Sequence, residues 1–179
     1  KRVFVINDGS DQETTEWLES FCQTKPYFEL INNSSNIGYT KTVNKGLSLA
    51  NSDYVITLNS DTIIPKNLIS GMLTCFSSDP KIGVVGPLSN AASWQNVPTL
   101  IGNDGKFAIN KIPFDLDTDE FNSIIRRASK YSFPKVEFVN GFCFMIKKAV
   151  LDKIGLLDEE AFPMGYGEEN DLCLRISEA

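Results

Sequence analysis

The sequence predicts an α/β protein in which a mostly parallel sheet is covered by helices on both faces. Short β-type apolar runs alternate with segments whose apolar residues recur at helical spacing. Strands that recur with helices between them are typical of βαβ units, whose strands run parallel and are buried on both faces. Polar clusters follow the first three predicted strands directly. In sheets of this class, ligands bind just beyond the carboxyl ends of the strands.

The first half of the chain carries the regular part of this pattern. Strands are predicted at residues 3–6, 28–31, 54–58 and 82–85. Residues 10–13 read Ser-Asp-Gln-Glu, which fits a capping box for a first helix that ends near Cys22, with Ser10 as the cap. A second helix is expected over residues 40–50. A third is expected to begin at Pro65, because proline suits the first position of a helix.

The second half is less regular. Residues 86–117 contain several proline, glycine and asparagine residues and predict a long loop over the site. A short helix is expected near residues 121–128. Residues 136–146 are strongly β-prone but are interrupted by Asn140-Gly141, a feature typical of a bulge or of close approach by a ligand. Helical turns are expected at residues 149–154, and a last helix follows the acidic residues near the end of the chain.

The composition restricts the class of partner. With 179 residues, 42% of them hydrophobic, the chain can bury one substantial core, so a single domain over residues 1–179 is expected. The net charge is −6 and the 17 basic residues form no dense run, which argues against nucleic acid or an acidic lipid surface as the main partner. No apolar stretch approaches the roughly 20 residues that span a bilayer, so no transmembrane segment is predicted in this chain.

The cysteines and the absence of histidine narrow the chemistry. Cys22, Cys75, Cys143 and Cys173 are widely spaced and lie in apolar surroundings, so they are expected to be core residues of a reduced, cytosolic protein. A zinc site of the usual kind needs closely spaced cysteine or histidine groups, and this chain contains no histidine. Any general base must therefore be a carboxylate, a lysine or a tyrosine.

Two acidic clusters are the candidate chemical groups. Asp61 follows a short apolar strand, where a carboxylate can hold a divalent cation and the cation can hold phosphates; ordinary turn chemistry is an equal alternative. Glu168, Glu169 and Asp171 lie together near the C-terminus, and the simplest reading places them in the first turn of a helix, where the dipole favours negative charge. If the strands are parallel, Asp8, residues 36–38 and residues 59–61 line one edge of the sheet.

Six short motifs occur in a family-specific order. They are Asn7-Asp8-Gly9-Ser10, Asn36-Ile37-Gly38-Tyr39 running to Asn44 and Gly46, Leu58-Asn59-Ser60-Asp61, Asn140-Gly141-Phe142-Cys143, Ile154 to Glu159, and Gly167 to Arg175. In this order and spacing, over nearly the whole chain, the sequence resembles the family 2 glycosyltransferases of the GT-A fold, which are inverting enzymes. The resemblance implies a mostly parallel Rossmann-like sheet with helices on both faces. It also implies a nucleotide-sugar half over residues 1–86 and an acceptor and catalytic half over residues 87–179.

The resemblance assigns roles to individual residues. Asp8 matches the acid that binds the nucleotide base, and Asp61 matches the last acid of an Asp-x-Asp motif that ligates Mn²⁺ or Mg²⁺. Asn59 replaces the first acid of that motif and is expected to bind the ribose. The catalytic base falls at Glu169, where the family usually has aspartate, so Glu168 and Asp171 remain alternatives for that role. The other residues implied in donor binding are Asn36, Gly38 and Asn44.

The resemblance also implies partners and a location. The expected substrates are a nucleotide-sugar donor and a glycan or lipid-linked acceptor, as in polysaccharide biosynthesis, in the cytoplasm or at the inner face of the membrane through segments outside this chain. The chain opens almost directly into a strand and stops within a predicted helix, so we expect a fragment that lacks the family's first strand and C-terminal part. Such a fragment is expected to bind nucleotide weakly and to turn over poorly. Two alternatives are a nucleotidyltransferase of similar fold and a non-catalytic domain that binds sugars or partner proteins.

Overall fold

The computed structural model describes residues 2–179 and divides into two compact units. The first unit comprises Lys1–Asn51 and Leu156–Asp171, and the second comprises Ser52–Gly155 and Leu172–Ala179. The division falls inside the last helix, α6 (Glu168–Glu178). Each unit therefore contains stretches of chain that are far apart in the sequence.

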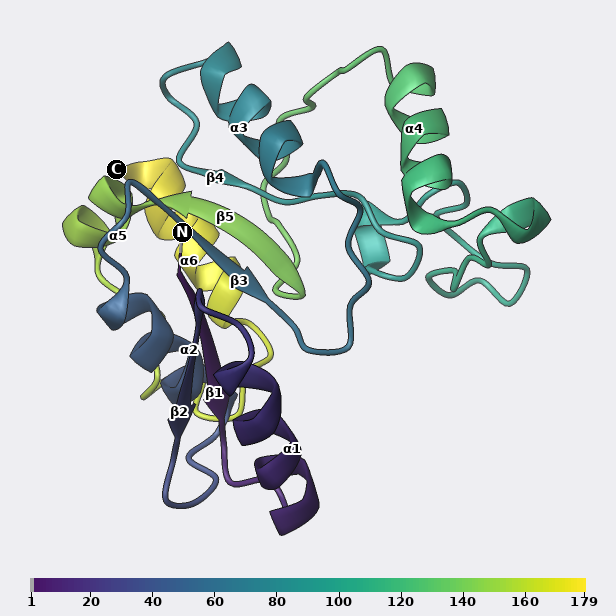
Figure 1. Ribbon diagram of the computed structural model, residues 1–179. Coiled ribbons are helices and arrows are strands. Elements are labelled where there is room, and N and C mark those ends of the chain that lie inside the picture. The colour runs from purple at the N-terminus through teal and green to yellow at the C-terminus, as the bar shows by residue number, and fades with distance from the viewer. Residues whose placement is uncertain (1) are drawn as a thin grey trace. The chain divides into compact units, whose positions relative to one another are not determined.

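The first unit is built on a parallel pair of strands. Strand β1 (Val3–Asn7) pairs with β2 (Phe28–Asn32) in parallel, as the sequence predicts. Helix α1 (Gln12–Gln23) contacts β2, and helix α2 (Tyr39–Leu49) contacts β1 (Figure 1). The parallel pairing brings the carboxyl ends of β1 and β2 to the same edge.

The first helix begins one residue later than its predicted cap. Asp11, rather than Ser10, is the N-cap, and its carboxylate accepts a hydrogen bond from the Thr14 N–H at 2.8 Å. The Ser10 N–H is held by the Asn7 side chain at 3.0 Å in the preceding turn. The backbone therefore turns into the helix at Asp11, and the prediction of Ser10 as the cap is wrong.

The second unit has a three-stranded sheet in the order β3-β5-β4. Its strands are β3 (Tyr54–Leu58), β4 (Val84–Val85) and β5 (Cys143–Lys147). Strand β5 is antiparallel to both neighbours, which makes β3 and β4 parallel to each other. After β4 the chain returns to the sheet at Cys143, which lies opposite Leu58. Strand β5 is therefore an antiparallel strand between β3 and β4, whereas a mostly parallel sheet was predicted.

The core of the second unit lies between β5 and helix α3 (Leu68–Ser78). Met72 and Phe76 of α3 pack with Cys143 and Met145 of β5, and all four are buried. The third helix begins later than predicted, because Pro65 lies in the turn before it and its carbonyl accepts a hydrogen bond from the Leu68 N–H at 3.1 Å.

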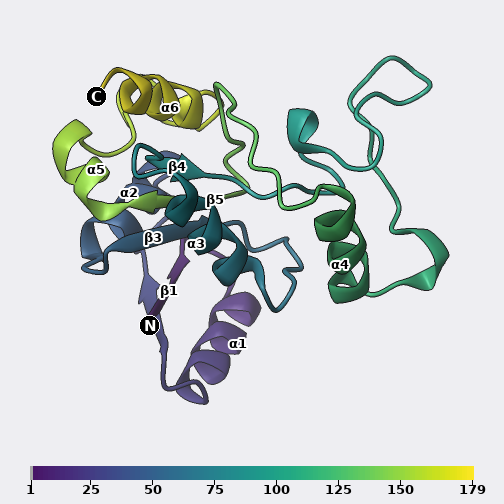
Figure 2. The ribbon, with the colours of Figure 1, turned by 90° about the horizontal axis from the view of Figure 1, so that it is seen from above.

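The remaining elements of the second unit connect or flank this sheet. The stretch from residue 86 to 117 has little regular structure, as predicted, and contains only the short 3-10 turns η1 (Ser93–Gln95) and η2 (Pro113–Asp115) in the part of the chain that is described. It leads to α4 (Thr118–Ala128), and Figure 2 shows both to one side of the β3-β5-β4 sheet. Helix α5 (Lys148–Ile154) follows β5 directly.

All four cysteines are buried and free, as expected for core residues. Burial raises the pKa of Cys143 to about 12 and also raises the pKa of Cys75, so these thiols stay protonated and unreactive. Within residues 2–179, the helices are all too short or too polar to span the apolar layer of a membrane.

Candidate functional site

Asp8 organises the loop that follows β2. Its carboxylate accepts hydrogen bonds from the Asn33 side chain at 2.8 Å, the Ile37 N–H at 3.0 Å and the Gly38 N–H at 3.1 Å. Burial raises the pKa of Asp8, but the hydrogen bonds outweigh burial and hold the pKa below its usual value. Asp8 is therefore an ionised group at the tips of β1 and β2. Asn36 lies in the same loop, and its side chain accepts a hydrogen bond from the Gly38 N–H at 3.1 Å.

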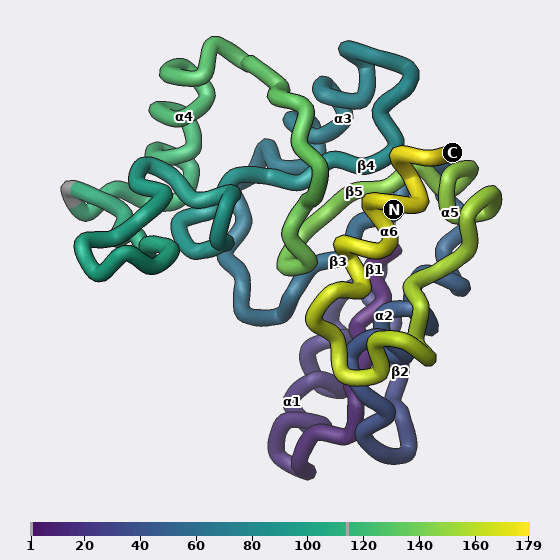
Figure 3. Tube along the Cα trace, turned by 180° about the vertical axis from the view of Figure 1, so that it is seen from behind, coloured from purple at the N-terminus to yellow at the C-terminus, as the bar shows by residue number. Residues whose placement is uncertain are grey.

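Helix α2 is attached to the stretch that leads into α6. The Asn44 side chain is buried, donates to the Leu157 carbonyl at 2.9 Å and accepts from the Leu157 N–H at 3.0 Å. It also donates to the Glu159 carboxylate at 3.1 Å. The fully buried Thr40 hydroxyl donates to the Phe162 carbonyl. Figure 3 shows this stretch, in yellow-green, running beside α2.

Gly38 allows the closest approach between these two stretches. It lies at the N-cap of α2 with a φ of 90°, and a Cβ there would lie 2.8 Å from the Pro163 carbonyl oxygen. Both the backbone conformation and the contact favour glycine. Two motifs separated by more than a hundred residues in the sequence therefore meet within the first unit.

The predicted acidic cluster lies in the first turn of α6. Glu168, Glu169 and Asp171 all fall there, as the helix-start reading predicts. Glu168 is only 4% exposed. The Oε2 atoms of Glu168 and Glu169 and the Oδ1 atom of Asn170 are buried without a hydrogen-bond partner among the described residues. Three consecutive residues thus present unsatisfied acceptors, which is unusual in a folded protein.

Tyr39 is a site residue that the sequence analysis did not single out. Burial, and then the charges of Glu168 and Glu169, raise the pKa of Tyr39 to about 12. The phenol therefore stays neutral beside the two acids. Tyr39 directly follows Gly38 in one of the six motifs, which was a signal. Its proximity to the acids becomes visible only in the structure, where Tyr39 and Glu168 both lie beside Gly165.

Asp61 is the candidate metal ligand and belongs to the second unit. It is exposed beyond the end of β3, and the turn is fixed by the Asn59 N–H, which donates to the Phe142 carbonyl at 2.9 Å. The residues described here include no group of three acidic, cysteine or histidine side chains that could hold a metal ion. A single exposed carboxylate nevertheless fits a Mg²⁺ or Mn²⁺ ion that takes its other ligands from substrate phosphates and water.

The predicted site residues thus fall into two sets. Asp8, Asn36, Gly38, Asn44 and the acids of α6 belong to the first unit, where α2 connects them. Asn59 and Asp61 belong to the second unit.

Trp94 lies in the long loop of the second unit and is a partly exposed anchor. Its indole N–H donates to the Phe138 carbonyl at 3.3 Å, and its ring packs edge-on against Phe107.

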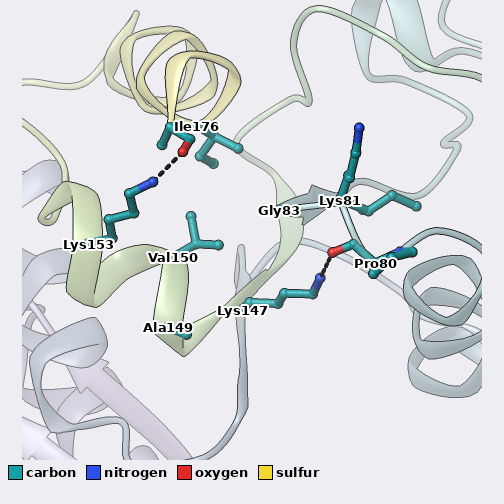
Figure 4. Close-up of a pocket in the computed structure, with 10 residues that line it drawn as sticks. Pro80, Lys81, Gly83, Lys147, Ala149, Val150, Lys153 and Ile176 are labelled. Carbon is teal, nitrogen blue, oxygen red and sulfur yellow. Dashed lines mark hydrogen bonds between the residues drawn. The ribbon is translucent and has the colours of Figure 1, made fainter.

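A cavity of about 250 Å³ in the second unit is separate from Asp61 (Figure 4). Its lining includes Lys81, Lys147 and Lys153 and no acidic side chain among the described residues. The Lys147 ammonium donates to the Pro80 carbonyl at 2.7 Å. Because Lys147 pairs with the first residue of β3, the cavity lies at the opposite end of that strand from Asp61.

Solved structures of other proteins define the fold of this chain. One is the mannosyltransferase PcManGT from Pyrobaculum calidifontis in complex with GDP-Man and Mn²⁺, with a TM-score of 0.64 over 98% of this chain and 42% of that one. Another is GalNAc-T7 with UDP, GalNAc and Mn²⁺, with a TM-score of 0.66 over 98% of this chain and 34% of that one. Each is 16% identical to this chain, and together they show that it has the GT-A glycosyltransferase fold.

The sequence comparison identifies the family. The family model described as Glycosyl transferase family 2 matches residues 1–155, and the chain belongs to this family. Similar curated proteins include the poly-beta-1,6-N-acetyl-D-glucosamine synthases of Staphylococcus epidermidis and Staphylococcus aureus. Each is 25% identical over 162 residues, which cover 89% of this chain. The chain spans 35% of the length of these relatives.

Proposed function

We propose that this glycosyltransferase-family chain belongs to an enzyme that transfers a sugar from a nucleoside-diphosphate donor to a hydroxyl group of a glycan or lipid-linked acceptor, with inversion. The buried Oε2 atoms of Glu168 and Glu169, which have no hydrogen-bond partner among the described residues, carry the proposal, since a base must remove a proton from the acceptor hydroxyl. The proposal applies to a chain as long as its relatives. It includes action at the inner face of the membrane and the choice of a glycan or lipid-linked acceptor.

The donor is proposed to bind at the strand ends. Asp8 is ionised and rigidly held, so it suits recognition of a hydrogen-bond donor on the nucleotide base. Asn59 suits a ribose hydroxyl, and residues 36–38 form the loop beside Asp8. Asn44 supports this arrangement through the Leu157 backbone, because its amide is engaged within the protein. In this scheme residues 1–86 bind the donor and residues 87–179 bind the acceptor.

A divalent ion at Asp61 would neutralise charge on the leaving diphosphate when bound. Asp61 offers one exposed carboxylate on a turn fixed by β3, which suits an ion shared with a substrate. Glu169 accepts the proton of the acceptor hydroxyl as the new bond forms on the opposite face of the sugar. A positioned base typically contributes about 10²–10⁴-fold to the rate.

Calorimetric titration of UDP and GDP, with and without Mn²⁺, tests the donor site. We expect nucleotide binding to the wild-type chain to depend on Mn²⁺ and to be lost in Asp61→Ala. Asp53→Ala is the matched control, because Asp53 is exposed just before the other end of β3. Equal loss in both variants, or binding that ignores the metal, would contradict the assignment of Asp61.

A second assay separates the two competing functions. A nucleotidyltransferase would release pyrophosphate from a nucleoside triphosphate and a sugar phosphate. A glycosyltransferase would release a nucleoside diphosphate from the nucleotide sugar. A non-catalytic domain would do neither, even when the chain is extended to the length of its relatives.

A further inference from the structure

In the first turn of α6, Glu168 and Glu169 each have a carboxyl oxygen that is buried from solvent. Glu168 is 4% exposed, and its Oε2 atom has no hydrogen-bond partner among the described residues. The same holds for Oε2 of the adjacent Glu169. Two neighbouring carboxylates, each with one buried oxygen that has no hydrogen-bond donor, repel each other and lose hydration, so ionising both is unfavourable.

Backbone N–H groups donate to the Glu168 carboxyl, but they do not outweigh the cost of burying its charge. A Cβ built on Gly165 would lie 3.6 and 3.8 Å from the two carboxyl oxygens of Glu168 and 3.5 Å from the ring of Tyr39. The Glu168 carboxyl and the Tyr39 ring therefore both lie beside the Gly165 backbone. The titratable groups that act on Glu168 are Tyr39 from α2, which stays neutral, and the adjacent Glu169 from α6 itself; Asp171 lies in the same helical turn.

We propose that Glu168 holds a proton at neutral pH and donates a hydrogen bond to the carboxylate of Glu169, so that Glu168 is a positioning residue and Glu169 the ionised base. The proton converts an unsatisfied acceptor into a donor and leaves one negative charge on the pair. The hydrogen bond holds the Glu169 carboxylate in one orientation at the start of α6. The identification of Glu169 as the base rests on the proposed function, whereas the proton on Glu168 does not.

The direction of the pKa shift agrees with this geometry. Burial, and to a smaller extent the charge of Glu169, raise the pKa of Glu168, while hydrogen bonds from nearby backbone N–H groups oppose the rise. A pKa that is higher in the folded than in the unfolded chain gives stability that is present below the unfolded value, about 4.3 for glutamate. That stability is lost as the pH rises through the folded value.

Urea unfolding across pH 4 to 8 tests the proton without any need for activity. Glu168→Gln mimics the protonated carboxyl, and Glu160→Gln is the matched control because Glu160 is exposed in the same unit. We expect the wild type and the control to lose stability relative to Glu168→Gln as the pH rises through the folded pKa of Glu168. Parallel pH profiles in all three proteins would overturn the proposal.

Infrared spectroscopy at pH 7 gives a direct readout. We expect a protonated-carboxyl C=O band in the wild type and in Glu160→Gln, and its absence in Glu168→Gln. A wild-type spectrum without this band at neutral pH would likewise overturn the proposal. Because this measurement needs no substrate, its outcome is independent of whether the chain proves to be a glycosyltransferase.

Turnover by the chain extended to the length of its relatives tests the positioning role. We expect Glu168→Ala to lower kcat about 10–100-fold, as the loss of a supporting partner does, and Glu168→Gln to recover most of that loss. Glu169→Gln should lose about 10²–10⁴-fold. If Glu168→Gln instead loses as much as Glu169→Gln, Glu168 is the base, and the inference fails while the proposed transfer reaction stands.

Discussion

In the first unit, single polar side chains form hydrogen bonds to backbone groups of residues that are distant in the sequence. Asn44 is the clearest case, because one amide binds both the N–H and the carbonyl of Leu157. Asp8 has a similar role in the loop before α2, where it accepts from two backbone N–H groups. Charged or amide side chains that satisfy buried backbone groups are costly to replace, since the backbone partners are then left without hydrogen bonds.

We predict that Asn44→Ala lowers the free energy of unfolding by about 2–4 kcal/mol, since each buried polar group left unpaired costs about 1–3 kcal/mol. Urea denaturation measures this change. Asn51→Ala is the control, because Asn51 is an exposed asparagine of the same unit. Equal effects of the two substitutions would mean that the Leu157 backbone finds other partners.

At this scale the sequence was only partly informative. The motifs placed Asp8, Gly38 and Asn44 among the important residues, but the pattern cannot distinguish a side chain that binds ligand from one that binds the chain's own backbone. The distinction depends on contacts with residues 157–163, which lie far along the sequence. For the same reason the role of Tyr39 beside the acids was not visible.

Helix α4 shows how a local signal fixes an element. Asp117 accepts from the Glu120 N–H at 2.8 Å, and the Glu120 carboxylate accepts in return from the Asp117 N–H at 2.9 Å. This reciprocal capping box satisfies two N–H groups that the helix start leaves unpaired. The helix packs none of its residues into a fully buried position, so its ends matter more than usual.

We expect Asp117→Ala to cost about 0.5–2 kcal/mol of stability, the usual range for loss of an N-cap. Asp117→Asn should retain most of it, because asparagine caps as well as aspartate. Thermal unfolding of the two variants, with hydrogen exchange in α4, makes the comparison. If the asparagine variant is as unstable as the alanine variant, the charge of Asp117 rather than its capping hydrogen bond is responsible.

Element boundaries and strand directions were predicted unequally well. The parallel pair β1 and β2 follows from alternating strand and helix patterns, which are local. The antiparallel insertion of β5 does not, because its direction depends on where the stretch after β4 returns to the sheet. The cap of α1 was assigned to Ser10 because Ser10 and Glu13 have the spacing of a capping box. In the structure the Asn7 side chain holds the Ser10 N–H, and Asp11 caps the helix instead.

Each of the two units contains a segment from the C-terminal part of the chain, Leu156–Asp171 in the first unit and Leu172–Ala179 in the second. We predict that a chain ending at Gly155, which is the last residue that the family model matches, loses protection from hydrogen exchange in α2. The loss should be at least about 10-fold, since several buried hydrogen bonds worth about 1 kcal/mol each disappear. Adding a peptide of residues 156–171 should restore part of the protection.

The matched control is a chain that ends after Asp171, which retains the partners of Thr40 and Asn44. Protection in α2 should then stay close to that of the full chain. If instead the chain ending at Gly155 keeps full protection, α2 is held by β1 and the contacts with the later stretch are dispensable.

The position of β5 in the sheet has a consequence for synthesis of the chain on the ribosome. Strand β3 is complete at Leu58, yet the neighbour to which it bonds begins only at Cys143. Ribosomes add about 5–20 residues per second, so the exposed edge of β3 waits on the order of 10 s for its partner. An unpaired strand edge is a template for pairing with other chains. The nascent polypeptide therefore exposes the edge of β3 that β5 later covers, and we expect chaperones to act on it at that stage.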